Sequence, residues 1–271
     1  MKGSMRAALV AEYRKLVSTR MWWLLLLVLA GYLAFIGVVM ASSFVFAPEE
    51  GSGAAPLEGA AAARAIYGLT NAVGYVFPLV IGSLAITAEF RHQTITETLL
   101  VEPRRGVLLT AKLLATVPIG LLYGVVGTVA VVGASAPLLA GWGDGAYLGD
   151  GSVVRVLVLG VLVTVLWTMI GVAFGSVVPN QVAAIVVILA FTQFVEPIAR
   201  LALGSFDGTE GVARFLPGAA ADGLIGSSLF GELAGGSSAL LSRPAALAVL
   251  LSYTVVLALV GRFTTLRRDV P

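Results

Sequence analysis

The sequence contains no cysteine and only one histidine, His92. The absence of cysteine excludes disulfides, thiolate metal sites and cysteine nucleophiles. A single histidine leaves little from which to build a histidine metal cluster or a Ser-His-Asp triad. Charge is also scarce: charged residues make up 12% of the 271 residues, whereas soluble domains carry about 25%. Because 58% of the residues are hydrophobic, the composition predicts an integral membrane protein.

Nucleotide-binding and hydrolase motifs are missing as well. The sequence has no Walker A pattern (GxxxxGK[ST]), no HExxH and no GxSxG. We therefore expect that this chain is not an enzyme and does not hydrolyse ATP itself. Its net charge of +2 is too small to suggest a nucleic-acid partner.

Long apolar runs predict an all-α protein with six membrane spans in a single transmembrane domain. A helix rises about 1.5 Å per residue, so each run is long enough for a hydrocarbon core of about 30 Å. The predicted spans are 21–46, 65–88, 107–139, 153–178, 182–203 and 244–263.

Two further segments are predicted to associate with the membrane without crossing it. Residues 1–20 form a basic amphipathic helix that we expect in the interface, with one apolar face made of Met5, Leu9, Tyr13 and Leu16. Residues 204–243 contain apolar pieces that are too short and glycine-rich to span, so we expect an extracellular or re-entrant segment.

Basic residues predict the orientation. Six spans put both termini on one side of the membrane. If that side is the cytosol, twelve of the 17 Lys and Arg residues lie in cytosolic segments and five lie outside. The positive-inside rule selects this arrangement. We therefore expect a multi-pass protein of the plasma membrane with both termini cytosolic.

A polar segment, Glu89 to Lys112, separates the second and third runs. In it, Thr94 to Glu97 has the form of a capping box, in which the Thr94 hydroxyl accepts from the Glu97 N–H and the Glu97 carboxylate reaches back. The box predicts a helix that starts at Thr94 and ends before Pro103. Its apolar face, which we expect to need a partner because it lies outside the lipid, contains Ile95, Leu99 and Leu100.

Charged residues near or within the spans are further candidates. Glu89 ends the second span close to Arg91, either as an interfacial boundary pair or with a role in transmitting motion. Glu196 and Arg200 are i, i+4 neighbours that can pair on one helix face. Either they are functional within the membrane, or the fifth span ends near 195 and the pair is interfacial. The candidates for a gate or substrate path are Gln193, Glu196 and Arg200.

Four glycines have the small-xxx-small spacing that lets helices approach closely in lipid. This spacing predicts packing within the bundle, with a dimer contact as the alternative. The two pairs are Gly120 with Gly124, and Gly171 with Gly175.

The lead-in, the six spans and the polar loop together resemble the ABC-2 type permeases, the membrane subunits of type V ABC transporters. The resemblance is carried by the lead-in residues Glu12 to Leu16 and Ser18 to Arg20, and by Glu89, Thr94, Glu97, Leu99, Leu100, Pro103 to Arg105 and Lys112. It implies that residues 89–106 contain a coupling helix that docks on a nucleotide-binding subunit. The implied ATPase-coupling residues are Glu89, Arg91, Thr94, Ile95, Glu97, Leu99, Leu100 and Arg104.

The resemblance also implies secondary features of such a permease. Pro179 to Gln181 would form a second, smaller cytosolic contact, and Leu216 to Gly218 would lie in the outer segment before the last span.

The function implied by this resemblance is export of an amphipathic or hydrophobic substrate. The chain itself would hold no catalytic, metal or cofactor site, because ATP and Mg are bound by the partner. The expected partners are an ABC ATPase subunit, a second permease subunit that is identical or a sibling, and membrane lipid. Two other classes remain open: an ion-coupled secondary transporter, which needs ionisable residues near mid-membrane, and a non-transporting sensor or assembly subunit.

Overall fold

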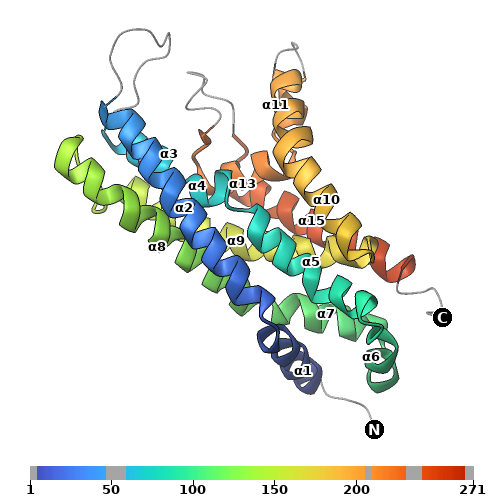
Figure 1. The fold of residues 1–271 in the computed structure, drawn as a ribbon. Helices are drawn as coiled ribbons and strands as arrows, with labels where there is room; N and C mark the ends of the chain where they lie inside the picture. Colours follow the sequence, from blue (N-terminus) through green and yellow to red (C-terminus); the bar gives the residue numbers. More distant parts are fainter. Residues whose placement is uncertain (1–4, 47–58, 205–208, 230–239, 266–271) are drawn as a thin grey trace.

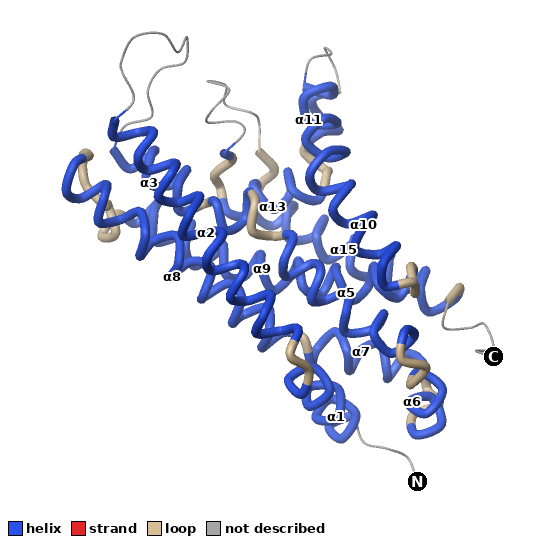
Figure 2. Tube along the Cα trace, in the orientation of Figure 1, coloured by secondary structure: helices blue, strands red, loops and turns tan. Residues whose placement is uncertain are grey.

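The computed structural model describes residues 5–46, 59–204, 209–229 and 240–265. Within these ranges the chain is all α, with no strand (Figure 2). Five helical stretches of the described chain are long and apolar enough to cross a membrane: Met21–Phe46, Arg105–Trp142, Gly151–Val177, Gln181–Leu203 and Arg243–Phe263. The prediction of an all-α, multi-pass membrane protein is confirmed at this level.

The described helices follow one another as α1 (Met5–Ser18), α2 (Met21–Phe46), α3 (Gly59–Tyr67), α4 (Leu69–Ala72), α5 (Val76–Arg91), α6 (Ile95–Val101), α7 (Arg105–Ala115), α8 (Val117–Trp142), α9 (Gly151–Val177), α10 (Gln181–Ala190), the π-helical turn η1 (Phe191–Val195), α11 (Glu196–Gly204), α12 (Glu210–Ala213), α13 (Pro217–Ile225) and α15 (Arg243–Phe263). Parts of the predicted 204–243 segment, residues 205–208 and 230–239, lie outside the described residues.

The long helices form an elongated bundle (Figure 1). α2 and α8 run alongside each other, and α9 lies in the middle of the molecule, between α8 and α15. α1, α6 and the end of α15 lie at one end of the bundle, here named the α6 end. α3 and α11 lie at the opposite end, here named the α11 end (Figure 1). The outer surface of α2 carries exposed apolar side chains, Leu27 and Phe35 among them, as expected for lipid contact.

The predicted second span, 65–88, is not a single helix. α3, α4 and α5 occupy it instead, and together they run from the α11 end to the α6 end (Figure 1). The breaks fall at two glycines, Gly68 and Gly74. A Cβ on Gly74 would lie 2.6 Å from the carbonyl oxygen of Thr70, so the chain turns where only glycine fits. The expectation of an unbroken helix is therefore wrong for this span.

The backbone released at this break is satisfied inside the protein. The N–H groups of Val73 and Gly74 both donate to the carbonyl of Leu69, at 3.0 and 3.1 Å. Leu69, Thr70 and Asn71 are buried. Irregular backbone at membrane depth is tolerated where protein surrounds it, so α4 forms a short polar element within the apolar bundle.

Glycines allow the central helices to touch. A Cβ on Gly82 of α5 would lie 2.1 Å from Thr168 O of α9, and one on Gly171 would lie 2.1 Å from Leu79 O of α5. Gly175 faces Ser83 of α5. These contacts confirm that the second glycine pair packs within the bundle.

The first glycine pair, Gly120 with Gly124, lies at the contact between α8 and α9. A Cβ on Gly120 or Gly124 of α8 would lie 2.9 Å from the Cα of Val165 or Val161 of α9. Helices in lipid associate through van der Waals contact between close backbones, so glycines hold α9 against both α5 and α8.

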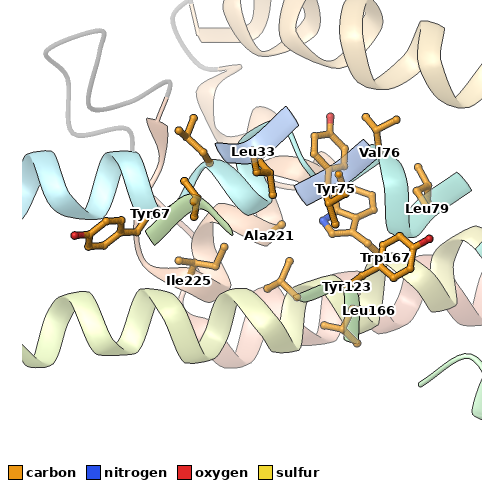
Figure 3. Packing of buried hydrophobic residues seen from close by; sticks show 14 of the residues in the cluster. Leu33, Tyr67, Tyr75, Val76, Leu79, Tyr123, Leu166, Trp167, Ala221 and Ile225 are labelled. Atoms are coloured by element: carbon orange, nitrogen blue, oxygen red, sulfur yellow. The ribbon is translucent and has the colours of Figure 1, made fainter. Parts of the chain in front are cut away.

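The main cluster of buried apolar residues surrounds α9 (Figure 3). The rings of Tyr75 and Trp167 lie 4.6 Å apart, centroid to centroid, and both belong to this cluster. Tyr123 is fully buried, and its hydroxyl donates to the Trp22 carbonyl at 2.6 Å. That bond ties α8 to the first turn of α2.

Gly171→Val is expected to destabilise the protein, because its Cβ meets the backbone of α5 rather than a side chain that can move. Overpacking of this kind costs about 1–3 kcal/mol. Thermal unfolding of the detergent-purified protein measures the effect. The matched control is Gly133→Val on α8, where a Cβ meets nothing within 4 Å. Equal melting temperatures for the two variants would contradict the proposed close contact of α5 with α9.

Candidate functional site

Four charged residues from three helices meet at the α6 end: Glu12 and Lys15 of α1, Glu89 of α5 and Lys112 of α7. We call them the ion cluster. Lys112 Nζ donates to Glu12 Oε2 at 2.5 Å, to Glu89 Oε1 at 2.7 Å and to the Ala85 carbonyl at 3.2 Å. Lys15 Nζ donates to Glu12 Oε1 and Glu89 Oε1, both at 2.8 Å. Two carboxylates and two ammonium groups balance.

Three members of the ion cluster, Lys112, Glu12 and Glu89, are buried. Only 1% of the Lys112 side chain is exposed, against 6% for Glu12 and 9% for Glu89. A buried ammonium group persists only when counter-charges and hydrogen bonds replace its hydration. The cluster therefore fixes α1, α5 and α7 relative to one another.

Lys15 is the exposed member of the ion cluster, with 44% of its side chain accessible. Burial acts to lower the pKa of Lys15, but the hydrogen bonds to Glu12 and Glu89 outweigh it, so the pKa is raised above 10.5. A raised lysine pKa means that the ion pairs of Lys15 stabilise the fold fully at pH values below the ordinary pKa of lysine. This stabilisation is lost as the pH rises through the pKa that Lys15 has in the folded protein. Lys15 thus stays charged at physiological pH.

Helix α6 lies directly beside this cluster. Lys15 Nζ also donates to Thr98 Oγ1 of α6 at 3.0 Å. The Thr94 N–H donates to the Glu89 carbonyl at 2.9 Å, so the backbone of α6 continues from the end of α5 through a tight turn. α6 is therefore attached to α1 and α5 through hydrogen bonds as well as through the chain.

The predicted capping box does not form. α6 starts at Ile95 with Thr94 as its N-cap, but the Thr94 side chain makes no capping bond. The reason is the end of α5: Gln93 has φ +57°, and the Thr94 and Gln93 N–H groups bond back to Glu89 and Phe90. In this Schellman motif the Thr94 N–H is already used. The Thr94 backbone is also helical, whereas a residue that caps a helix with its side chain is typically extended.

The predicted apolar face of α6 is divided between two surroundings. Ile95 is buried and Leu99 partly buried against a small cluster formed by Ile86, Leu108, Leu109 and Val172. Leu100 is 79% exposed and its neighbour Val101 85%. The prediction that the whole face awaits a partner is therefore wrong for Ile95 and Leu99, since the protein's own helices cover them. An apolar tip of two residues remains outside.

The remaining predicted coupling residues surround α6. Arg91 Nη1 contacts Gln181 Oε1 at 3.4 Å, which links the end of α5 to the turn between α9 and α10. Arg91 does not pair with Glu89, whose partners are Lys15 and Lys112, so the interpretation as a boundary pair is wrong. Glu97 is exposed.

Arg104 pairs locally with Glu102. Its guanidinium donates to the Glu102 carboxylate at 2.7 and 2.9 Å, and these hydrogen bonds lower the pKa of Glu102. The pair bridges the short loop between α6 and α7, so the loop carries an exposed arginine whose charge is already matched.

A second charged group lies toward the α11 end. Glu196 and Arg200 of α11 form the predicted i, i+4 pair, with Arg200 Nη2 and Nε at 3.0 and 3.3 Å from Glu196 Oε1. Arg200 Nη1 also donates to Asp222 Oδ2 of α13 at 2.8 Å. Only 1% of the Glu196 side chain and 16% of the Arg200 side chain are exposed. The pair is therefore buried within the protein rather than exposed. We call these three residues the charged triad.

A π-helical turn precedes the charged triad. The Glu196 N–H reaches back to the Phe191 carbonyl, and the next residue, Pro197, has no N–H to donate. The Thr192 carbonyl therefore loses its helical donor, and the Tyr75 hydroxyl donates to it at 3.0 Å. π-turns inside helices often accompany functional sites. The Tyr75 hydrogen bond attaches this turn to the start of α5, and Tyr75 lines the same cavity as the buried acids Glu196 and Asp222.

A cavity of about 210 Å³ lies between α4, η1, α11 and α13. Two carboxylates and one guanidinium of the charged triad line it, together with Gln193, the third predicted path residue. Gln193 Nε2 contacts Thr192 Oγ1 at 3.4 Å. The three residues predicted as a gate or path thus share one cavity wall.

Glu12, Lys112 and Asp222 were not predicted as site residues, although Glu12 and Lys112 are among the residues that carry the family resemblance. Each carried a weak signal. Lys112 stands in an apolar helical stretch, where a lysine requires an acidic partner, and Glu12 is three residues before Lys15 on the lead-in helix. Asp222 stands in a stretch of alanine, glycine and leucine that was too short to assign to a span.

No protein-family model matches this chain, and no curated protein matches it in sequence. The features of this chain that bear on its function are the ion cluster, α6 and the charged cavity.

Lys112→Met is expected to destabilise the protein by about 3–5 kcal/mol, because it leaves Glu12 and Glu89 buried with only Lys15 between them. Thermal unfolding measures the loss. Adding Glu12→Gln to Lys112→Met should restore part of it.

The matched control is Arg104→Met, which removes a half-exposed cation from Glu102 and is expected to lower the melting temperature much less. A Lys112→Met protein as stable as the Arg104→Met protein would mean that the ion cluster does not hold the three helices.

Proposed function

We propose that this chain is the membrane subunit of an ATP-driven exporter, powered by a separate ATPase that docks on α6. The observation that carries the proposal is the exposed apolar tip of α6, Leu100 and Val101, on a helix anchored by the ion cluster. Exposed apolar residues on an anchored helix outside the long spans are suited to contact with another protein.

The surroundings of the tip support a protein partner. Glu97, Arg104 and Arg105 lie within five residues of Leu100 in the sequence, so the apolar tip is flanked by charges of both signs. An apolar centre with a charged rim is the usual composition of a protein interface. The Gln181 turn, linked to Arg91, lies at the same end and offers a second contact.

The anchoring of α6 supports a role in transmitting force. A displacement of α6 acts on α5 through the Thr94–Glu89 backbone bond and on α1 through Lys15. The ion cluster passes it to α7, which leads into α8 at Thr116. An ATPase that moves α6 would therefore move three helices together.

The cargo proposed here is amphipathic or hydrophobic. In this proposal the chain crosses the membrane six times, with the second crossing made of α3, α4 and α5. These crossings form half of the transport path, and a second permease subunit would supply the other half. Both partners lie outside this chain, so ATP and Mg would bind to the ATPase subunit. The proposed location is the plasma membrane, with the α6 end in the cytosol.

The charged triad favours one second candidate, an ion-coupled secondary transporter. Such proteins place ionisable residues inside the membrane and facing a cavity, and the buried acids Glu196 and Asp222 line a cavity in this chain. The two candidates differ in energy source. Transport that persists without ATP but stops when the proton or sodium gradient is collapsed would favour the second.

The docking proposal predicts that Leu100→Asp with Val101→Asp separates the chain from its ATPase. Because both side chains are exposed, the variant should fold and melt like the parent. At the interface it places charges in an apolar contact, which costs several kcal/mol, so recovery of the ATPase should fall at least about tenfold. Co-purification from the native membrane in mild detergent, scored by ATP hydrolysis in the eluate, measures this.

The matched control is Leu148→Asp, an exposed leucine on the connection between α8 and α9, which should retain the ATPase. An eluate of the parent chain with no ATPase would refute the exporter proposal. If the double variant and the control recover equal amounts of ATPase, the ATPase does not dock on the tip of α6.

The proposed orientation is testable by thiol labelling, because the sequence has no cysteine to remove. In sealed cells, Gly149→Cys at the α8–α9 connection should react with a membrane-impermeant thiol reagent. Thr96→Cys on α6 should react only after the membrane is permeabilised. Labelling of Thr96→Cys in sealed cells would place α6 outside and would exclude a cytosolic ATPase as its partner.

A further inference from the structure

The cavity beside the charged triad is lined by more acidic than basic groups. Its lining residues include two carboxyl groups, of Glu196 and Asp222, and one guanidinium, of Arg200. An uncompensated charge in a membrane protein interior is costly, so this wall favours a positively charged group. The ion cluster at the other end, by contrast, is already balanced.

The hydrogen bonds of the two acids leave one carboxylate oxygen without a donor. Asp222 Oδ2 accepts from Arg200 and from Ser228 Oγ, at 2.8 and 2.9 Å. Glu196 Oε1 accepts from Arg200 and from the Gly218 N–H, the latter at 2.6 Å. Glu196 Oε2 is buried and makes no hydrogen bond.

Asn71, another lining residue of the cavity, carries a second buried oxygen without a partner. Asn71 Oδ1, on the short helix α4, makes no hydrogen bond. The Asn71 amide nitrogen lies against Gly160 of α9, where it would be 2.7 Å from an added Cβ. Glu196 Oε2 and Asn71 Oδ1 are both acceptors, and buried acceptors are normally paired with donors. A ligand that satisfies both must carry more than one N–H or O–H.

The size of the cavity narrows the class of ligand. At about 30 Å³ for each water in the liquid, 210 Å³ corresponds to about seven waters. That is too large for a single bare metal ion and smaller than the pockets of about 300–1,000 Å³ that hold drug-sized molecules. Ala72, Val73 and Pro197 provide an apolar wall, and Tyr75 an aromatic one. An aromatic ring also attracts cations.

We propose that this cavity binds the ammonium group of an organic primary amine, with Glu196 Oε2 as its counter-ion and Asn71 Oδ1 as a second acceptor. A primary ammonium has three N–H donors and can satisfy both oxygens. A quaternary ammonium carries the same charge but has no N–H. The alkyl part of the amine lies against the apolar wall. The site belongs to the membrane chain alone and does not depend on the proposed ATPase.

The first experiment compares ligands on the purified chain in detergent, without any partner. n-Butylammonium chloride is titrated while thermal unfolding is followed, with tetramethylammonium chloride and sodium chloride at the same ionic strength. A ligand that binds the folded state raises the melting temperature in a saturable way. We expect such a rise with butylammonium, a much smaller one with tetramethylammonium, and none with sodium or with neutral 1-butanol.

The second experiment changes the site. Glu196→Gln removes the counter-ion but keeps an acceptor for Gly218, and it should weaken butylammonium binding about ten- to hundredfold. Asn71→Leu keeps the charge and removes one acceptor, so it should weaken binding less. If Glu196→Gln does not fold, Asn71→Leu and the ligand series still decide the outcome. The control, Asp144→Asn, removes a carboxylate of a separate cavity near Trp142 and should bind like the parent.

A third arm identifies the source of the amine. Phosphatidylethanolamine in mixed micelles should compete with butylammonium, and phosphatidylcholine should not, if the ligand is a lipid headgroup. Failure of both to compete assigns the site to a free small amine. Either result keeps the primary-amine site.

Three results would overturn the proposal. Equal shifts with butylammonium and tetramethylammonium would remove the role of the N–H donors. A shift with sodium as large as that with butylammonium would identify an inorganic cation site instead. Unchanged butylammonium binding in Glu196→Gln, or no saturable binding to the parent, would show that the cavity does not hold an amine. None of these results bears on ATPase docking.

Discussion

The arrangement of the α6 end depends on the neutralisation of Lys112. Its ammonium group is buried where three helices meet, and among the described residues Glu12 and Glu89 are the acids that pair with it. Both acids are on other helices, one at the start of the chain and one at the end of α5. The cost of leaving any of these charges unpaired thus selects a single way of packing α1, α5 and α7. The packing of these three helices also positions α6, which is bonded to Lys15 and follows directly from the turn that ends α5.

The middle of the bundle obeys a different constraint, the contact of backbones. α9 meets α5 and α8 at glycines, where a single methyl group would overlap a carbonyl or a Cα atom. Such contacts hold helices at fixed separation without polar groups. The two constraints divide the molecule: electrostatics determines the arrangement at the α6 end, and shape determines it along the shared axis of the helices.

Much of this architecture was predictable from the sequence. Five of the six predicted spans correspond to helices long and apolar enough to cross a membrane, because length and hydrophobicity are local properties. The glycine spacing correctly indicated packing within the chain. The pairing of Glu196 with Arg200 followed from helical periodicity. The break at Gly68 and Gly74 was not predicted, since glycine is common in membrane helices and only the close approach of Thr70 O to Gly74 makes it decisive.

Errors arose where a group had two possible partners. Thr94 has the sequence of a capping residue, but its N–H serves the end of the preceding helix instead. Arg91 is two residues from Glu89 and nevertheless bonds to Gln181, because Glu89 is paired with lysines from other helices. Asp222 was not recognised as a partner of Arg200 since 22 residues separate them and α13 has no periodic signal of its own. Local patterns predict helices well, but long-range pairing depends on which helices meet.

The carbonyl of Thr192 gives α10 and α11 an unusual joint. Its bond comes from the hydroxyl of Tyr75 on a neighbouring segment, not from the helix in which it lies. Because Pro197 has no N–H to offer this carbonyl, the joint is held from outside the helix. The Arg200–Asp222 pair and the bond from the Gly218 N–H to Glu196 hold α11 in the same way. The direction that α11 takes beyond α10 therefore depends on side chains and backbone of other helices, and not only on its own backbone hydrogen bonds.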